Sequence, residues 1–457
     1  MAMIMISLYD SSRSRAEARK KIVVDNVKKI RSGSRFFSFC FQVIFSSLLI
    51  FLNNNLNFVK CLKRPSFFCC KSMLCVYLHI PFCQKVCDYC DFRVMPVQSS
   101  LYAEYTNLLC KQIVCFERKN PGVLAAAETL YLGGGTPSAL PAVYLKEIFE
   151  CLASVGVDAH KLSEVSMEFN PESTNEASVD AALELGVNRV SLGLQTFDAT
   201  LLQLVGRSHS VEAGIRALNL LMSRPGLQVN ADLMFDLPTQ TVQGFLTDVD
   251  RLSDFPLNHV SFYGLNVSPR SRLGHRVSRG ELSVNEDVYE PMYLGGVEIL
   301  ERKGFGRYEV SNFAKPGFES RHNQNYWNRG EYVGFGPGAH SFWGGSRFNA
   351  PEIYPRWREY VREGCPAAKL SVDSLTRDDE IMELIWLSLR QSKGLSFGDL
   401  AALGIVDAER RASKCVDKYI RKEFVINEGG NLRLKGRGWI FMDEIVTDLA
   451  NAYSNLE

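Results

Sequence analysis

The chain alternates short apolar runs with amphipathic stretches from Leu74 to Lys303, and this alternation restricts its fold more than any other feature. The apolar runs have the length of buried strands, and the amphipathic stretches have the spacing of surface helices. Strands separated by helices run parallel through right-handed crossovers, so we expect a curved parallel sheet covered by helices. The expected strands are residues 76–80, 129–132, 164–169, 189–194, 228–235 and 259–265, and the expected helices are residues 101–118, 141–155, 175–185, 211–223, 242–252 and 286–303.

These six strand–helix units are two short of a closed eightfold barrel. The predicted fold class is therefore α/β, with a partial, TIM-like (β/α)6 barrel that is open on one side. In complete barrels the functional residues lie at the carboxyl ends of the strands, and we expect the same arrangement in this chain.

The pattern changes after about residue 370, where helices are expected at 378–390, 396–403 and 409–422 and a small hairpin at 424–426 with 432–434. Helices followed by a hairpin predict a small helical, winged-helix-like C-terminal domain. Such modules often bind DNA, but the mixed charge of this segment does not favour nucleic acid as a partner. The predicted domains are an N-terminal extension (1–72), the barrel with a C-terminal elaboration (73–345), a linker (346–369) and the C-terminal domain (370–457).

Three of the 13 cysteines lie in one short loop, PFCQKVCDYCDF, directly after the first expected strand. Cys83, Cys87 and Cys90 have the spacing C-x3-C-x2-C, and thiolates this close on a loop can converge on one soft metal centre. In a [4Fe-4S] cluster, three thiolates leave one iron open to another molecule. Zinc usually takes a fourth protein ligand, for which His79 is the candidate; zinc and unrelated free thiols are the weaker alternatives.

Glycine and polar residues follow the later strands. The sequence GGGT at 133–136 follows the second strand, where glycines let the backbone approach a ligand and successive amides can receive a carboxylate. Glu168, Gln195 and Asp232 stand at the ends of the next three strands, and Arg207 follows Gln195. A charge inside a barrel needs a partner, so we expect Asp232 to bind a ligand or to pair with Arg207.

These motifs resemble the radical S-adenosylmethionine (SAM) superfamily, in which the open iron binds SAM and an electron from the cluster cleaves it to methionine and a 5′-deoxyadenosyl radical. Residues 77 to about 343 resemble the oxygen-independent coproporphyrinogen III oxidase family, through GGGTP, EFNPE, GVNRVSLGLQTF, GRSHS and YEVSNFA. The resemblance implies a radical SAM barrel in which the three loop cysteines hold the cluster. The SAM contacts that it implies are Tyr77, Gly134, Gly135, Thr136, Glu168, Gln195, Arg207 and Asp232.

Two features favour one branch of that family. The oxidases carry a further cysteine two residues after the third, whereas this chain has Phe92 there. The sequence RHNQNYW at 321–327 resembles the HNxxYW motif of heme chaperones of the HemW type. Imidazole is a good axial ligand for heme iron, so His322 is a candidate heme ligand and His340 is a second. The alternative is that His322 forms hydrogen bonds within a packed loop.

The resemblance implies a HemW-type heme chaperone that uses a [4Fe-4S] cluster, SAM and heme. Its partners would be recipient hemoproteins of the respiratory chain, including membrane hemoproteins, and a homodimer stays an open alternative. The alternative function is an oxygen-independent coproporphyrinogen III dehydrogenase, a radical SAM enzyme that oxidatively decarboxylates two propionates. A radical SAM enzyme with another small substrate is the third alternative. The missing fourth cysteine argues against coproporphyrinogen oxidase activity.

Charge separates the first 72 residues from the rest, since they hold 13 of the 52 Lys and Arg residues but only 3 of the 51 Asp and Glu residues. Within them, residues 36–52 form an apolar run at the lower limit of a bilayer-spanning length. This run fits a membrane anchor or uncleaved signal, an organellar targeting extension, or a stretch that precedes a translation start at Met73. We favour the last interpretation and a cytoplasmic protein, because oxygen-sensitive cluster chemistry needs a reducing compartment.

Overall fold

The computed structural model describes residues 73–373 and 375–453. The N-terminal extension, including the apolar run 36–52, lies outside the described residues, so the three interpretations of that run stay predictions. Within the described ranges, no helix combines the length and the apolar character needed to cross a membrane.

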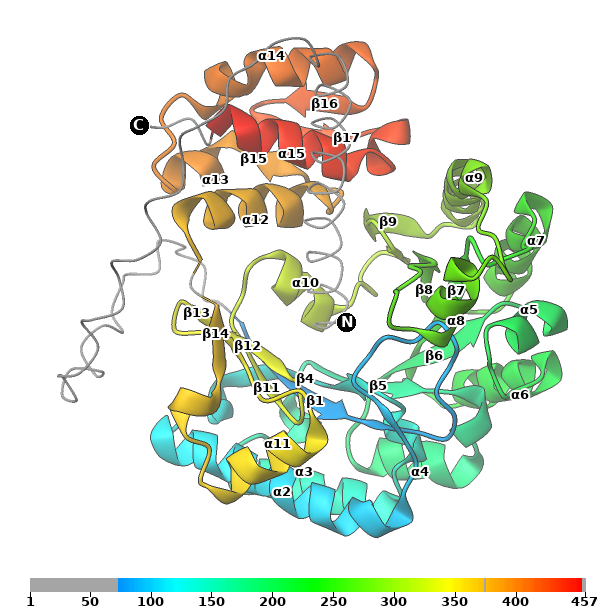
Figure 1. The fold of residues 1–457 in the computed structure, drawn as a ribbon, viewed down its shortest axis with the longest axis vertical. Coiled ribbons are helices and arrows are strands. Elements are labelled where there is room, and N and C mark those ends of the chain that lie inside the picture. The colour runs from blue at the N-terminus through cyan, green and yellow to red at the C-terminus, as the bar shows by residue number, and fades with distance from the viewer. Residues whose placement is uncertain (1–72, 374, 454–457) are drawn as a thin grey trace, which may run out of the picture. The chain divides into compact units, whose positions relative to one another are not determined.

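Six parallel strands form the centre of a twelve-stranded sheet in the described part of the chain (Figure 1). They lie in chain order across the sheet, which confirms the predicted α/β fold with six units. Most of their residues are buried because both faces of the sheet are covered, and all seven residues of the first strand are buried. The strands are β1 (Leu74–Ile80), β4 (Ala127–Gly134), β5 (Glu164–Phe169), β6 (Arg189–Gln195), β7 (Gln228–Phe235) and β8 (His259–Gly264), and the helices that follow them are α2 (Ser99–Lys119), α3 (Ala142–Ser154), α4 (Glu176–Glu184), α6 (Val211–Met222), α7 (Val242–Ser253) and α9 (Tyr289–Arg302).

The sheet stays open, and shorter strands extend both of its edges. Beyond β1 lie β11 (Tyr332–Phe335), which pairs with it in parallel, and then the antiparallel strands β12 (His340–Trp343), β13 (Ser346–Asn349) and β14 (Ser371–Asp373). Beyond β8 lie the antiparallel strands β10 (Asn312–Ala314) and β9 (Gly306–Glu309).

The segment 346–369, expected to be a linker, is folded onto the barrel. It contains β13 and the helix α11 (Tyr354–Arg362), and β14 follows directly. Although α11 is rich in charge, its aromatic residues share one face and pack toward α2, where Trp357 is completely buried. The indole nitrogen of Trp357 donates to Oε1 of Gln112 on α2 at 2.9 Å. This buried face corrects the expectation of a linker.

The C-terminal domain contains the predicted helices and hairpin, together with a last helix that was not predicted. A capping box formed by Thr376 and Asp379 starts its first helix. Arg390 joins this domain to the barrel through Glu309, with both side chains almost fully buried and Nη2 2.6 Å from Oε2. The helices are α12 (Arg377–Leu389), α13 (Phe397–Ala402), α14 (Ala408–Arg421) and α15 (Met442–Tyr453), and the antiparallel sheet consists of β15 (Leu395–Ser396), β17 (Asn431–Leu434) and β16 (Val425–Glu428).

Candidate functional site

The cysteine loop is tied to the barrel at its start, middle and end. It begins in β2 (Phe82–Cys83), which pairs in parallel with β3 (Met95–Pro96). In its middle, the amide of Asp88 donates to the carbonyl of Val205 at 3.0 Å, and the carbonyl of Asp88 accepts from Leu273 at 2.7 Å. These bonds hold the loop over the carboxyl ends of the central strands, where the functional residues were expected.

No disulfide links the loop thiols to one another or to any other of the nine cysteines of the described residues. In the ranges that the structure covers, no three His, Cys, Asp or Glu side chains converge closely enough to hold one metal ion, and this includes the loop thiols. Burial raises the pKa of Cys83 to about 11 and that of Cys90 to about 12. These thiols would therefore ionise only with the help of a metal's charge, which deprotonates a coordinating thiol.

Arg207 connects the cysteine loop to the strand ends. Its Nη1 donates to Sγ of Cys87 at 3.5 Å, and its Nη2 donates to Oδ1 of Asn170 at 2.7 Å and to the carbonyl of Gly193 at 2.8 Å. The guanidinium is buried, and its Nε has no hydrogen-bond partner. A fixed cation beside a cysteine stabilises the thiolate form, as an iron-sulfur ligand requires.

Asn170 was not predicted as a site residue, although it lies at the centre of the polar cluster. Its Nδ2 donates to Oγ1 of Thr136 at 2.7 Å while its Oδ1 accepts from Arg207. Thr136 in turn donates to Sγ of Cys83 at 3.7 Å. Asn170 thus links the glycine loop, the cysteine loop and Arg207. The sequence signal was its place in EFNPE, two residues after Glu168 at the end of a strand.

The glycine loop is packed too tightly for side chains. A Cβ on Gly134, whose φ is +108°, would lie 2.3 Å from Nδ1 of His79, and a Cβ on Gly135 would lie 2.7 Å from the carbonyl oxygen of Phe82. The amides of Gly135 and Thr136 donate to carbonyls of the β1–β2 segment. These two amides hold the cysteine segment in place instead of pointing freely at a ligand, as the sequence suggested.

Glu168 lies beside the glycine loop. Its Oε2 accepts from the amide of Gly134 at 3.0 Å, and its Oε1 accepts from the hydroxyl of Tyr131 at 2.8 Å. The ring of Tyr131 stacks on that of Tyr77 with centroids 6.1 Å apart. The structure therefore brings Glu168 and Gly134 together, and Tyr77 lies one ring away.

Gln195 ends β6 in a strained backbone conformation. Its φ is 71°, and the pairing of β6 with β7 shifts register between Gly193 and Gln195. A Cβ on Gly193 would lie 2.8 Å from Nε2 of Gln195 and 2.9 Å from Oδ1 of Asn170. The absence of a side chain at Gly193 thus leaves room for both the Gln195 amide and the Asn170 side chain. Strain of this kind is commonly kept at functional sites.

Asp232 does not pair with Arg207, which corrects that part of the expectation. Its carboxylate accepts from Oγ of Ser191 at 2.8 Å and from Nδ2 of Asn230 at 2.7 Å. Burial raises the pKa of Asp232 to about 6, and the nearby charge of Glu168 acts in the same direction. Two carboxylates therefore share this end of the barrel without a cation between them, as suits a site for a positively charged ligand.

The ring of His79, the candidate fourth ligand of a zinc site, is engaged in hydrogen bonds. His79 is fully buried between the hydroxyl of Tyr77 and the carbonyl of Arg93, each 3.1 Å from a ring nitrogen, and burial lowers its pKa to about 4. Its nitrogens are therefore not available to zinc in this conformation. His340 is at the start of β12 and is partly exposed. The part of its ring that is buried is sufficient to lower its pKa to about 4.

His322 lies on the short helix α10 (Arg321–Trp327), which packs against β4. Its Nδ1 is 2.8 Å from Oγ1 of Thr129, and its Nε2 is 2.8 Å from the hydroxyl of Tyr326. The side chain is fully buried, and burial lowers its pKa to about 3. Iron could bind His322 only if one of these hydroxyls moved away.

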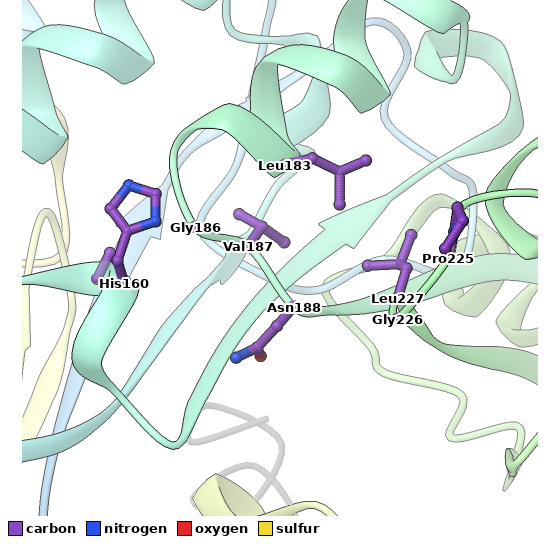
Figure 2. Close-up of a pocket in the computed structure, with 9 residues that line it drawn as sticks. His160, Leu183, Gly186, Val187, Asn188, Pro225, Gly226 and Leu227 are labelled. Atoms are coloured by element: carbon purple, nitrogen blue, oxygen red, sulfur yellow. The ribbon is translucent and has the colours of Figure 1, made fainter.

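A pocket lies at the amino ends of the strands, opposite to the polar cluster at their carboxyl ends (Figure 2). Its volume is about 300 Å³. His160, Val187, Asn188 and Leu227, which line it, precede the strands β5, β6 and β7. None of the residues predicted to bind a cofactor lines this pocket, so it is separate from the polar cluster at the carboxyl ends.

The chain is similar to known families and proteins over most of its described length. Residues 77–252 match the Radical SAM superfamily, and residues 375–441 match the HemN C-terminal domain. Among solved structures, it is similar to the coproporphyrinogen III oxidase HemN from Escherichia coli, described as a radical SAM enzyme. The TM-score is 0.71 and the identity 20%, over 84% of this chain and 90% of that one. At this identity the likeness concerns the fold.

Curated relatives are similar at higher identity. The protein named heme chaperone HemW from Lactococcus lactis is 30% identical over 79% of this chain and 93% of its own length. The proteins of the same name from Bacillus subtilis and Mycobacterium tuberculosis are each 33% identical, over 71% and 82% of this chain and 85% and 94% of their own lengths. Identity at this level across nearly whole chains shows that the chain belongs to the HemW family of the radical SAM superfamily.

Proposed function

We propose that this chain is a heme chaperone that binds heme and passes it to hemoproteins of the respiratory chain. The observation that carries the proposal is the identity of 30–33% with proteins named heme chaperone HemW, over most of both chains. Phe92, in place of a fourth loop cysteine, supports the same assignment. The cytoplasm is part of this proposal, because an iron-sulfur cluster is best preserved in a reducing compartment.

We also propose that Cys83, Cys87 and Cys90 hold a [4Fe-4S] cluster whose open iron binds SAM. When bound, the cluster and SAM supply the electron and the sulfonium that radical chemistry requires. The residues of this chain position and charge the site: Arg207 provides a cation at Cys87, while Glu168 and Asp232 provide carboxylates that suit the positive charge of SAM. These opposite charges would favour one orientation of a ligand that carries both a cation and a carboxylate.

The heme contact at His322 stays a prediction, and it requires that a hydrogen bond of this histidine is broken. Because both ring nitrogens are engaged, heme iron at His322 would displace the hydroxyl of Tyr326 or of Thr129. His340 is partly exposed, although its burial is still sufficient to lower its pKa to about 4. The two histidines therefore offer alternative positions for the proposed axial ligand, and His340 is the more exposed of the two.

Anaerobic reconstitution tests these proposals. The full chain would be loaded with iron, sulfide and SAM, titrated with heme, and mixed with an apo-hemoprotein. We expect a brown, iron-containing protein, a Soret shift on addition of heme, and transfer of heme to the acceptor. Cys87→Ala should abolish the cluster absorption. Conversion of coproporphyrinogen to protoporphyrinogen, or zinc in place of iron and sulfide, would overturn the assignment.

Variants of the two histidines locate the heme. Loss of the Soret shift in His340→Ala but not in His322→Ala would place the ligand at the more exposed position, and the reverse result would place it on α10. A shift that survives both substitutions would contradict both heme assignments. N-terminal sequencing of the native protein tests the start at Met73, because a mature chain that retains residues 36–52 excludes it.

A further inference from the structure

Two cysteines face each other where α2 packs against α3, far along the chain from the cysteine loop. Sγ of Cys110 on α2 lies 3.9 Å from the carbonyl oxygen of Glu147 on α3. Sγ of Cys151, one turn after Glu147, lies 3.7 Å from the carbonyl oxygen of Cys110. Each thiol therefore contacts the helical turn that carries the other, which places both sulfurs at one helix crossing.

A cavity gives small molecules access to this crossing. It encloses about 800 Å³ between α2, α3 and α11, and Cys110 is part of its lining. Lys111, Arg118, Arg362 and Glu147 line the same cavity, and Arg362 is paired with Glu104 at 2.7 Å. The thiolate is the species that reacts with oxidants, and the cavity opens this crossing to small oxidants beside Cys110.

We propose that Cys110 and Cys151 form a peroxide-reactive dithiol site that closes a reversible disulfide between α2 and α3. The proposal rests on the contacts of the two thiols and on the cavity beside them, and it does not depend on heme, SAM or cluster binding. Nothing in the proposed chaperone function uses these cysteines.

The two thiols have different parts in the reaction. The interaction between the two side chains lowers the pKa of Cys151 and raises that of Cys110, so Cys151 is the thiol that ionises more readily. The Cys151 thiolate attacks hydrogen peroxide, the O–O bond breaks, and hydroxide leaves as a sulfenic acid forms on Cys151. Cys110 then attacks the sulfenyl sulfur, the S–O bond breaks, and water leaves. Two thiols and one peroxide give one disulfide and two waters, and a dithiol reductant restores the thiols.

Closing this bond would restrain the glycine loop region. The 42-residue segment from Cys110 to Cys151 contains β4 and residues 133–136. A disulfide that closes a loop of this length restricts the unfolded chain. We therefore expect it to raise the Tm of a protein of this size by on the order of 5 °C.

Peptide mapping tests the proposal on the reconstituted full chain. The protein would be treated with increasing hydrogen peroxide, blocked with N-ethylmaleimide and digested without reduction. We expect a Cys110–Cys151 cross-linked peptide that dithiothreitol removes, together with the rise in Tm. Cys415, a partly buried thiol on α14, is the reference for uncatalysed oxidation. The relevant hydrogen peroxide doses are those that oxidise the cysteine loop. The proposal is overturned if N-ethylmaleimide still labels Cys110 and Cys151 as fully as it labels Cys415 at these doses.

Single variants test the order of the steps. In Cys110→Ser, the sulfenic acid on Cys151 should persist and be trapped by dimedone, whereas in Cys151→Ser neither position should react. Cys115→Ser removes the other thiol of the cavity lining and should leave the cross-link unchanged. A Cys110–Cys115 cross-link, or the loss of the Cys110–Cys151 cross-link in Cys115→Ser, would contradict the proposed pairing.

Discussion

Replacing Arg207 with methionine removes the cation that joins the cysteine loop to the strand ends. Methionine keeps a similar length and apolar stem but cannot donate to Asn170, to the carbonyl of Gly193 or to Cys87. Both oxygen acceptors lie in the barrel interior, so we expect the loss of these bonds to cost folding free energy as well as cluster affinity.

The size of the effect follows from the number of acceptors left without this donor. Each buried acceptor that loses its donor costs about 1–3 kcal/mol, and two such oxygens accept from Arg207. The carboxylate of Glu172, 14% exposed and 3.9 Å from Nη2, loses its cation as well. We therefore expect Arg207→Met to reduce the free energy of unfolding by about 3–5 kcal/mol, the range found when one partner of a buried charge pair is removed.

Urea denaturation of the full chain measures this cost, and iron content after reconstitution measures the effect on the loop. Arg272→Met is the matched control, because Arg272 is 72% exposed and lies 3.8 Å from Asp88 of the same loop. We expect the control to lose less than about 1 kcal/mol and to bind iron normally. Arg207→Lys should recover only part of the loss, since one ammonium cannot bridge all three acceptors. Equal stabilities of Arg207→Met and Arg272→Met would refute the reasoning.

Three further predictions follow from the same structure. Gly134→Ala should destabilise the fold by about 2–4 kcal/mol in urea denaturation, because its Cβ would meet His79 at a positive φ, and a cost under 0.5 kcal/mol would contradict the packing. The folded state raises the pKa of Asp232 to about 6, so wild type should lose stability relative to Asp232→Asn as pH rises from about 4 to 7; parallel pH profiles would disprove this. Arg390→Met and Glu309→Gln should each cost about 3–5 kcal/mol, with the double variant more stable than the sum predicts, and strict additivity would show that the pair is uncoupled.

The central sheet could be predicted from the sequence because each strand carries buried apolar residues and amphipathic helices separate the strands. The bounds predicted for β5 and β7, residues 164–169 and 228–235, agree with the structure. The edge strands could not be predicted in this way. All three residues of β14 are exposed, and those of β13 are only half-buried, so neither strand carries a hydrophobic signal. Their pairing depends on contacts between segments distant in the sequence, which a local pattern does not contain.

The candidate site was predictable in position but not in its connections. Parallel strands place their carboxyl ends on one edge of the sheet, so Glu168 and Gln195 were expected there. The partners of each side chain depend on rotamers and on backbone irregularity. Asn170 and Arg207 meet beside Gly193, where an added Cβ would lie 2.9 Å from Oδ1 of Asn170 and 3.5 Å from Nη2 of Arg207, and no local sequence pattern predicts this contact. Asp232 consequently has Asn230 and Ser191 as its partners, since the cation expected beside it is held elsewhere.

The helix α10 joins the barrel to the C-terminal domain as well as carrying the motif that resembles heme chaperones. The carboxylate of Glu164 accepts from Oγ of Ser320 at 2.9 Å and from the amide of Arg321 at 2.8 Å, so it caps the positive end of this helix from the start of β5. At the other end, the guanidinium of Arg390 lies 3.6 Å from the ring centroid of Trp327. Movement of His322 toward a ligand would therefore strain contacts in the barrel and in the C-terminal domain together. Heme at His322 and a change in the position of the C-terminal domain should consequently occur in the same step, whereas heme at His340 leaves this joint intact.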